Sequence, residues 1–99
     1  MQTHSITLGM NIPNAGTVTN QMWIDFLNVT VLASLEYATI TDSIGIYKGT
    51  IEKSKTISVT TSDPAAVEAL QAVGDAYKAA FNQESVMYAV TNVPILQFT

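Results

Sequence analysis

The residues of this sequence that could do chemistry are few, and most of them are carboxylates. Glu36, Asp42, Glu52 and Glu84 fall at the ends of predicted strands or in turns. Two carboxylates brought together could carry out acid–base chemistry or bind a hard cation such as Mg²⁺. Spacing along the chain leaves open whether any two of them meet.

The polar stretches that hold two of these carboxylates also have a purely structural interpretation. A predicted hairpin carries charges of both signs, at Glu52, Lys53 and Lys55. Ion pairs exposed to water contribute only about 0 to 1 kcal/mol each to stability. The stretch Asn82–Ser85 follows a predicted helix, and asparagine commonly ends a helix in the left-handed conformation. We therefore interpret the first as a solvated hairpin and the second as a joint between helix and strand.

Other catalytic motifs are scarce. His4 is the only histidine, and its place in an alternating strand pattern indicates a partly buried imidazole more than a general base. The sequence has no cysteine, which excludes thiol nucleophiles and zinc–thiolate clusters. It also has no phosphate-binding glycine motif and no G-x-S-x-G. We predict no catalytic residue, no metal site and no cofactor, and favour a protein that is not an enzyme.

Length, charge and hydropathy restrict the class of protein. The 99 residues predict a single domain, 1–99, large enough to bury a core without a metal or a disulfide. The net charge of −4 disfavours binding to nucleic acid. No apolar stretch approaches the roughly 20 residues of a membrane-spanning helix. Because no basic and apolar leader follows Met1, we expect a cytoplasmic protein, or an exported one if a leader has been removed.

The elements that must position the polar residues follow from hydrophobic periodicity. Alternation over Thr3–Ile12 predicts a half-buried strand, which runs into a loop over 11–16. Thr19 is suited to cap a helix. Apolar residues then recur every three or four positions, so this helix is expected to continue to about Leu32 or Ser34.

The second half of the chain adds a hairpin, a helix and a strand. Residues 37–47 and 51–61 predict two paired strands, with a bulge or kink near Gly45. Ser62–Pro64 combines a cap with a proline at the first helical position, and a strand is predicted over 85–90. The apolar face of the second helix is predicted to carry Val67, Leu70, Val73, Tyr77, Ala80 and Phe81.

The predicted order β-α-β-β-α-β defines an α+β fold. Two right-handed βαβ halves joined by a hairpin form a ferredoxin-like plait, a four-stranded antiparallel sheet with two helices on one face. The first and third strands are central in this arrangement. Their open face is predicted to carry hydroxyl groups, which pair modestly across strands and tolerate water. The residues of this face are Thr3, Ser5, Thr7 and Gly9 beside Thr56, Ser58 and Thr60.

Two motifs resemble a known family. Glu-x-Ser-Lys occupies 52–55, and Tyr-Lys-x-x-Phe-x-Gln-Glu-Ser-Val occupies 77–86. Over Gly9–Phe98 the sequence resembles an uncharacterised domain-of-unknown-function family of short, often exported bacterial proteins. The resemblance implies a fold and no activity. The sequence departs from the family over Ala33–Thr39, where members typically carry a basic run with Pro-Asp-Gly.

The predicted site combines the polar residues of the hairpin with those near the end of the second helix. Its members are Glu52, Lys55, Lys78, Gln83 and Glu84.

The favoured function is a small non-catalytic binding or assembly domain. We expect it to form a homodimer or larger homo-oligomer, because a plait leaves one sheet face uncovered and its edge strands unpaired. The alternative is a small-molecule enzyme of the dimeric α+β barrel type, with His4, Glu52 or Glu84 inside a closed apolar pocket. The expected partners include no nucleic acid and no membrane, and the sequence identifies no particular ligand.

Overall fold

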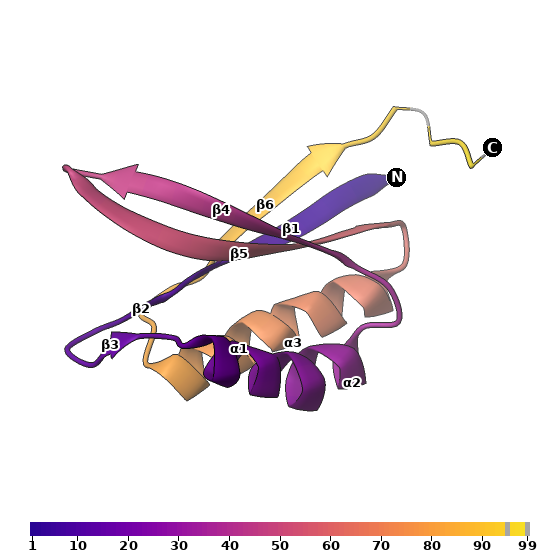
Figure 1. Ribbon diagram of the computed structural model, residues 1–99. Helices are drawn as coiled ribbons and strands as arrows, with labels where there is room; N and C mark the ends of the chain where they lie inside the picture. Colours follow the sequence, from indigo (N-terminus) through magenta and orange to yellow (C-terminus); the bar gives the residue numbers. More distant parts are fainter. Residues whose placement is uncertain (95, 99) are drawn as a thin grey trace.

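The main sheet has four antiparallel strands, and both helical segments lie on one of its faces (Figure 1). The structure, a computed structural model, describes residues 1–94 and 96–98, apart from the side chain of Tyr47. The order of the strands across the sheet is β4-β5-β1-β6, which is the order of a ferredoxin-like plait. The strands are β1 (Gln2–Gly9), β4 (Thr39–Tyr47), β5 (Thr50–Thr61) and β6 (Met87–Asn92).

The first connection holds a small hairpin and a helix of mixed winding. β2 (Asn11–Ile12) pairs with β3 (Gly16–Thr17), so the predicted strand Thr3–Ile12 is interrupted after Gly9. The helical segment then runs through α1 (Asn20–Phe26), the π-helical turn η1 (Leu27–Val31) and α2 (Leu32–Ser34).

The π-helical turn lets this helix keep its apolar side on the sheet. Thr19 caps α1 as predicted, because its hydroxyl accepts a hydrogen bond of 3.2 Å from the Met22 amide. Phe26 and Val31 are both buried although they lie five positions apart. This spacing of five matches the i→i+5 hydrogen bonds of a π-helix. In an α-helix, the residues that share a face are three or four positions apart.

The second helix, α3 (Pro64–Phe81), begins and ends as its sequence predicts. The Asp63 carboxylate accepts a hydrogen bond of 3.0 Å from the Ala65 amide, and Pro64 takes the first helical position. Asn82 ends the helix in the left-handed conformation, with φ 52° and ψ 43°. Over residues 1–94 and 96–98, no helix has the length and apolarity to cross a membrane.

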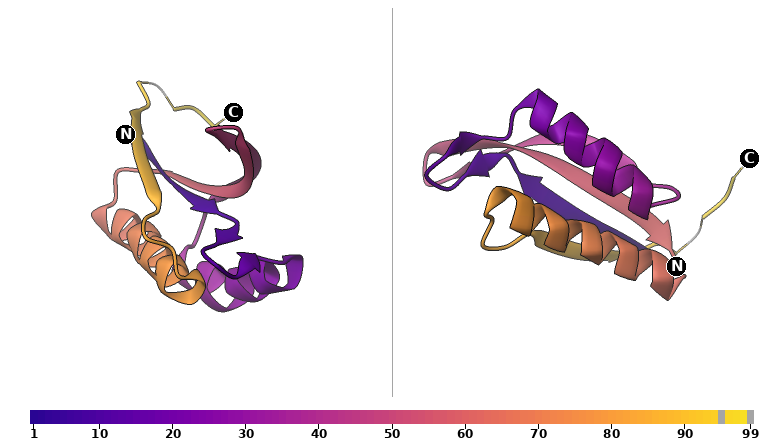
Figure 2. Two further views of the ribbon diagram at one scale, coloured as in Figure 1. Left: turned by 90° about the vertical axis from the view of Figure 1, so that its left-hand side faces the viewer. Right: turned by 90° about the horizontal axis from the view of Figure 1, so that it is seen from below.

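The core lies between the two helices and the sheet (Figure 2). The α3 residues Leu70, Val73, Tyr77 and Phe81 are buried as predicted, but Ala80 is exposed, which corrects its place on the apolar face. The Phe26 ring packs edge-on against the Tyr77 ring, with their centroids 5.3 Å apart. The sheet contributes Ile6, Leu8, Ile57 and Val59, and Met10 joins them from the position directly after β1.

The other face of the sheet carries hydroxyl groups, which confirms the prediction for the central strands. The hydroxyls of Thr3 and Thr60 lie 2.7 Å apart across β1 and β5, and those of Thr7 and Thr56 lie 3.2 Å apart. The pattern extends to β4, where the Ser43 hydroxyl lies 2.7 Å from that of Ser54. The part of the open face formed by these residues is therefore polar and uncharged.

Two details of the strands differ from the prediction. The bulge expected near Gly45 is wrong, because Gly45 pairs with Glu52 in the regular antiparallel register of β4 and β5. A glycine inside a strand indicates either a bulge or a close approach by another group, and the sequence does not distinguish the two. The last strand begins at Met87 in place of residue 85, because Gln83–Val86 form the connection from α3.

The left-handed conformation of Asn82 makes a direct prediction about stability. Asn82→Gly should change the free energy of unfolding by no more than about 0.5 kcal/mol. Asn82→Val should lower it by about 1 to 2 kcal/mol, because a β-branched residue is strained in this region. Urea denaturation measures both effects. Asn28→Val, inside the helical segment, is the control, and an equal loss at the two positions would contradict the assignment.

Candidate functional site

A cavity of about 560 Å³ opens where β1 ends. It lies at the open face and is lined by residues of all four strands of the main sheet, by the turn that follows Asn11 and by Gln83–Ser85. Two of its lining residues are acidic, Glu52 and Glu84, and no described lysine lines it. The cavity is therefore negative, and its remaining polar groups are hydroxyls, two side-chain amides and the backbone.

The Glu52 side chain lines this cavity and is held there by the backbone around the end of β1. Its Oε2 accepts a hydrogen bond of 3.1 Å from the Asn11 amide. Its carboxylate also lies against Gly9, so closely that a Cβ atom at this position would come within 3.0 to 3.1 Å of the carboxylate atoms. A side chain at position 9 would therefore force the Glu52 carboxylate to shift by a few tenths of an ångström.

Gln83 holds the backbone of Asn11 at its carbonyl, whereas Glu52 holds it at the amide. Its Nε2 donates hydrogen bonds to the Asn11 carbonyl at 2.8 Å and to the Phe81 carbonyl at 3.1 Å. The Gln83 amide donates to the Lys78 carbonyl at 3.0 Å. These bonds confirm the predicted joint between helix and strand. Asn11 is therefore held at both of its backbone groups, because its amide donates to Glu52 and its carbonyl accepts from Gln83.

Tyr77 supports the cavity from the core side. Its hydroxyl donates a hydrogen bond of 2.6 Å to the Gly9 carbonyl. Burial, and to a smaller degree the charge of Glu52, raises the pKa of Tyr77 to about 12. The phenol consequently stays protonated at neutral pH and remains a donor. The sequence analysis placed Tyr77 in the core and missed this role, although a buried tyrosine hydroxyl generally needs a partner.

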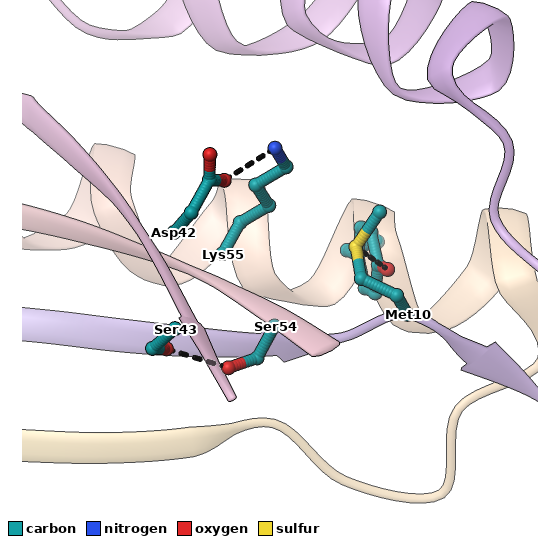
Figure 3. Close-up of polar contacts among 6 residues, drawn as sticks. Met10, Asp42, Ser43, Ser54 and Lys55 are labelled. Carbon is teal, nitrogen blue, oxygen red and sulfur yellow. Dashed lines mark hydrogen bonds and ion pairs between the residues drawn. The ribbon is translucent and has the colours of Figure 1, made fainter. Parts of the chain in front are cut away.

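The two predicted lysines lie elsewhere. Lys55 is on the face of β5 that points to the helices, where it forms an ion pair with Asp42 (Figure 3). Its Nζ lies 5.5 Å from the centre of the Trp23 ring. Lys78 pairs with Asp75 on α3 at 3.2 Å. Of the five predicted site residues, the structure thus brings together Glu52, Gln83 and Glu84.

Strand alternation explains why Glu52 is separated from the hairpin lysines. Lys53 and Lys55 project to the helix side of β5, whereas Glu52 lines the cavity at the open face. Among the described residues, Glu52 forms no ion pair with either lysine. The three charged residues thus lie on one hairpin, as predicted, but on opposite faces of it.

His4 lies away from the cavity. Its buried ring hydrogen-bonds the Tyr88 hydroxyl through Nδ1, which confirms the predicted partly buried imidazole. Within residues 1–94 and 96–98, no three histidine, aspartate or glutamate side chains gather closely enough to hold a metal ion.

The chain belongs to the family described as "Protein of unknown function (DUF3574)", which it matches over residues 3–96. This match confirms the resemblance to a domain of unknown function. Comparison with curated proteins finds no match.

Solved structures with a similar fold come from a phage enzyme. A phage SAM lyase in complex with S-methyl-5′-thioadenosine aligns with a TM-score of 0.65 and 22% identity over 91% of this chain and 79% of that chain. The phage SAM lyase in its apo state aligns with a TM-score of 0.64 and 24% identity over 91% and 78%. At this level of identity the likeness establishes the fold.

The contact between Gly9 and Glu52 can be tested by a double-mutant cycle. Gly9→Ala should lower the free energy of unfolding by about 1 to 3 kcal/mol, because the new methyl group displaces the carboxylate or the strand. Glu52→Ala should recover at least about 0.5 kcal/mol of that loss. The matched control is Gly45→Ala, where the nearest atom to a new Cβ is 3.9 Å away. Strictly additive effects of Gly9→Ala and Glu52→Ala would contradict the contact.

Proposed function

We propose that the protein is a small-molecule enzyme that takes a cationic ligand of the S-adenosylmethionine class into the acidic cavity at the end of β1. The observation that carries this proposal is the fixed carboxylate of Glu52, which accepts from the Asn11 amide and lies against Gly9. The likeness in fold to a phage SAM lyase supports the choice of ligand. The proposal takes up the enzyme alternative of the sequence analysis and places its ligand in an open polar cavity.

Size and charge both suit this ligand. The cavity volume of about 560 Å³ is within the range of roughly 300 to 1,000 Å³ that small-molecule sites occupy. S-adenosylmethionine carries positive charge on its sulfonium and ammonium groups, which Glu52 and Glu84 attract. Its ribose and adenine offer hydrogen-bonding groups to Thr7, Ser54 and Ser85, which also line the cavity.

The chemistry of the sulfonium defines what Glu52 does in this proposal. When the carboxylate of the same S-adenosylmethionine molecule attacks the carbon bonded to sulfur, a C–O bond forms as the C–S bond breaks, and the amino acid portion leaves as a lactone. The electron pair of the broken bond moves to sulfur, and the sulfonium becomes a neutral thioether. A carboxylate beside the sulfur would therefore stabilise the substrate more than the transition state and would slow the reaction. The ammonium keeps its charge throughout, so Glu52 binds the ammonium and thereby orients the reacting carbon chain.

Incubation of the purified chain with S-adenosylmethionine tests the proposal. Chromatography should detect S-methyl-5′-thioadenosine as the product. Glu52→Gln retains an oxygen acceptor for the Asn11 amide but removes the charge, and should lower kcat/KM roughly 10- to 100-fold. Glu68→Gln, on the exposed side of α3, is the matched control and should leave kcat/KM unchanged.

Calorimetry measures the binding of S-adenosylmethionine separately from its cleavage. The folded chain should bind S-adenosylmethionine, and Glu52→Gln should weaken that binding to a greater extent than Glu68→Gln does. A folded chain that neither binds nor cleaves S-adenosylmethionine would overturn the proposal.

Self-association is the second candidate function, and the edge strand β6 favours it. β6 pairs with β1 along one side only, so its other side presents unpaired backbone groups. None of its six residues is charged, and Met87 and Val90 are 64% and 45% exposed. Edge strands that stay monomeric usually carry lysine, proline or bulges, and β6 has none of these. We infer that two copies pair through β6 around a two-fold axis.

Size-exclusion chromatography with light scattering tests this assembly. The chain should elute with a mass above the 10.6 kDa of a single copy. Val90→Lys places like charges opposite each other across the axis and should shift the equilibrium toward the monomer by roughly tenfold or more. The matched control is Val29→Lys, at a position 75% exposed on the helical segment. A monomer at all concentrations would exclude self-association.

A further inference from the structure

A second cavity lies on the other face of the same hairpin. The arm formed by β4 and β5 extends past the helices, above the small hairpin of β2 and β3 (Figure 1). Between the arm, the end of β1 and the start of α1 is a space of about 710 Å³. The helices cover the central part of the sheet and leave this end uncovered.

Four large apolar side chains line this second cavity, together with eight polar or charged residues. Met10 and Val18 form its inner wall and are buried against the core. Ile44 and Ile51 form the wall under the arm, and each is 66% exposed. Water therefore contacts large aliphatic side chains on the side of the sheet that elsewhere packs against helices. Covering them with an apolar group would be favourable.

The charges of this cavity are opposite in sign to those at the open face. It is lined by Asp42, Lys53 and Lys55, and Asp42 is already paired with Lys55. Among the described residues, no carboxylate lies within ion-pair distance of Lys53. The cavity thus combines a group of four apolar side chains with one lysine that has no ion pair among the described residues.

We propose that this cavity binds a small anionic amphiphile, such as a medium-chain carboxylate. The aliphatic chain lies between Ile44, Ile51 and the inner wall, and the acid group pairs with Lys53. A polyanion such as nucleic acid does not suit the site, because binding it needs several neighbouring cations and this cavity has one free lysine. A single opposite charge beside aliphatic walls is the complement of an amphiphile.

Calorimetry with dodecanoate tests the proposal on the full chain. One molecule of dodecanoate should bind per chain, and dodecyltrimethylammonium should bind at least tenfold more weakly. Lys53→Glu should weaken dodecanoate binding roughly tenfold or more, and Lys53→Arg should preserve it. The matched control is Lys78→Glu, which makes the same charge change on α3 and should have no effect.

Nuclear magnetic resonance of isoleucine methyl groups locates the ligand. The methyl signals of Ile44 and Ile51 should shift on addition of dodecanoate, while that of Ile6 in the core should not. Unshifted Ile44 and Ile51 signals, or equal losses from Lys53→Glu and Lys78→Glu, would overturn the proposal. A shift of the Ile44 and Ile51 signals with protein concentration alone would also overturn it, because a second copy would then occupy the cavity.

Discussion

The hydrogen bond from the Tyr77 hydroxyl to the Gly9 carbonyl joins the helical layer to the point where β1 ends. The positions of Glu52 and Asn11 both depend on where the backbone of Gly9 lies. Gly9 leaves room for the Glu52 carboxylate, and the next residue but one, Asn11, is held through both its amide and its carbonyl. Burial raises the pKa of Tyr77 to about 12, so the phenol remains a hydrogen-bond donor at neutral pH.

The alternation of a single strand separates two different chemical environments. Glu52 of β5 lines the acidic cavity, and Ile51, Lys53 and Lys55 line the aliphatic one, while Ser54 lines both. Glu52 and Lys53 are neighbours in sequence but lie on opposite sides of the sheet. A one-residue change of register would exchange the two faces. The alternation within β5 therefore keeps the negative and positive groups apart, and the register with the neighbouring strands decides which face each group occupies.

Much of the fold could be predicted because its signals are local. The cap at Thr19, the proline at 64 and the left-handed Asn82 each depend on a few neighbouring residues, and the structure has all three. The hydroxyl groups of the open face followed from period-two alternation in β1 and β5. The π-helical turn and the regular pairing of Gly45 were missed, because they depend on how the helix meets the sheet and on what lies opposite a glycine.

The sequence by itself determined the order of the elements, the polar character of the open face and the family to which the chain belongs. Only the tertiary structure decided which polar residues meet. It joined Glu52 and Gln83 through Asn11, which lies far from both in sequence, and it separated Lys55 and Lys78 from them. The physical reason is that periodicity assigns a residue to a face, whereas the register between strands and the end of a helix decide its neighbours across the sheet.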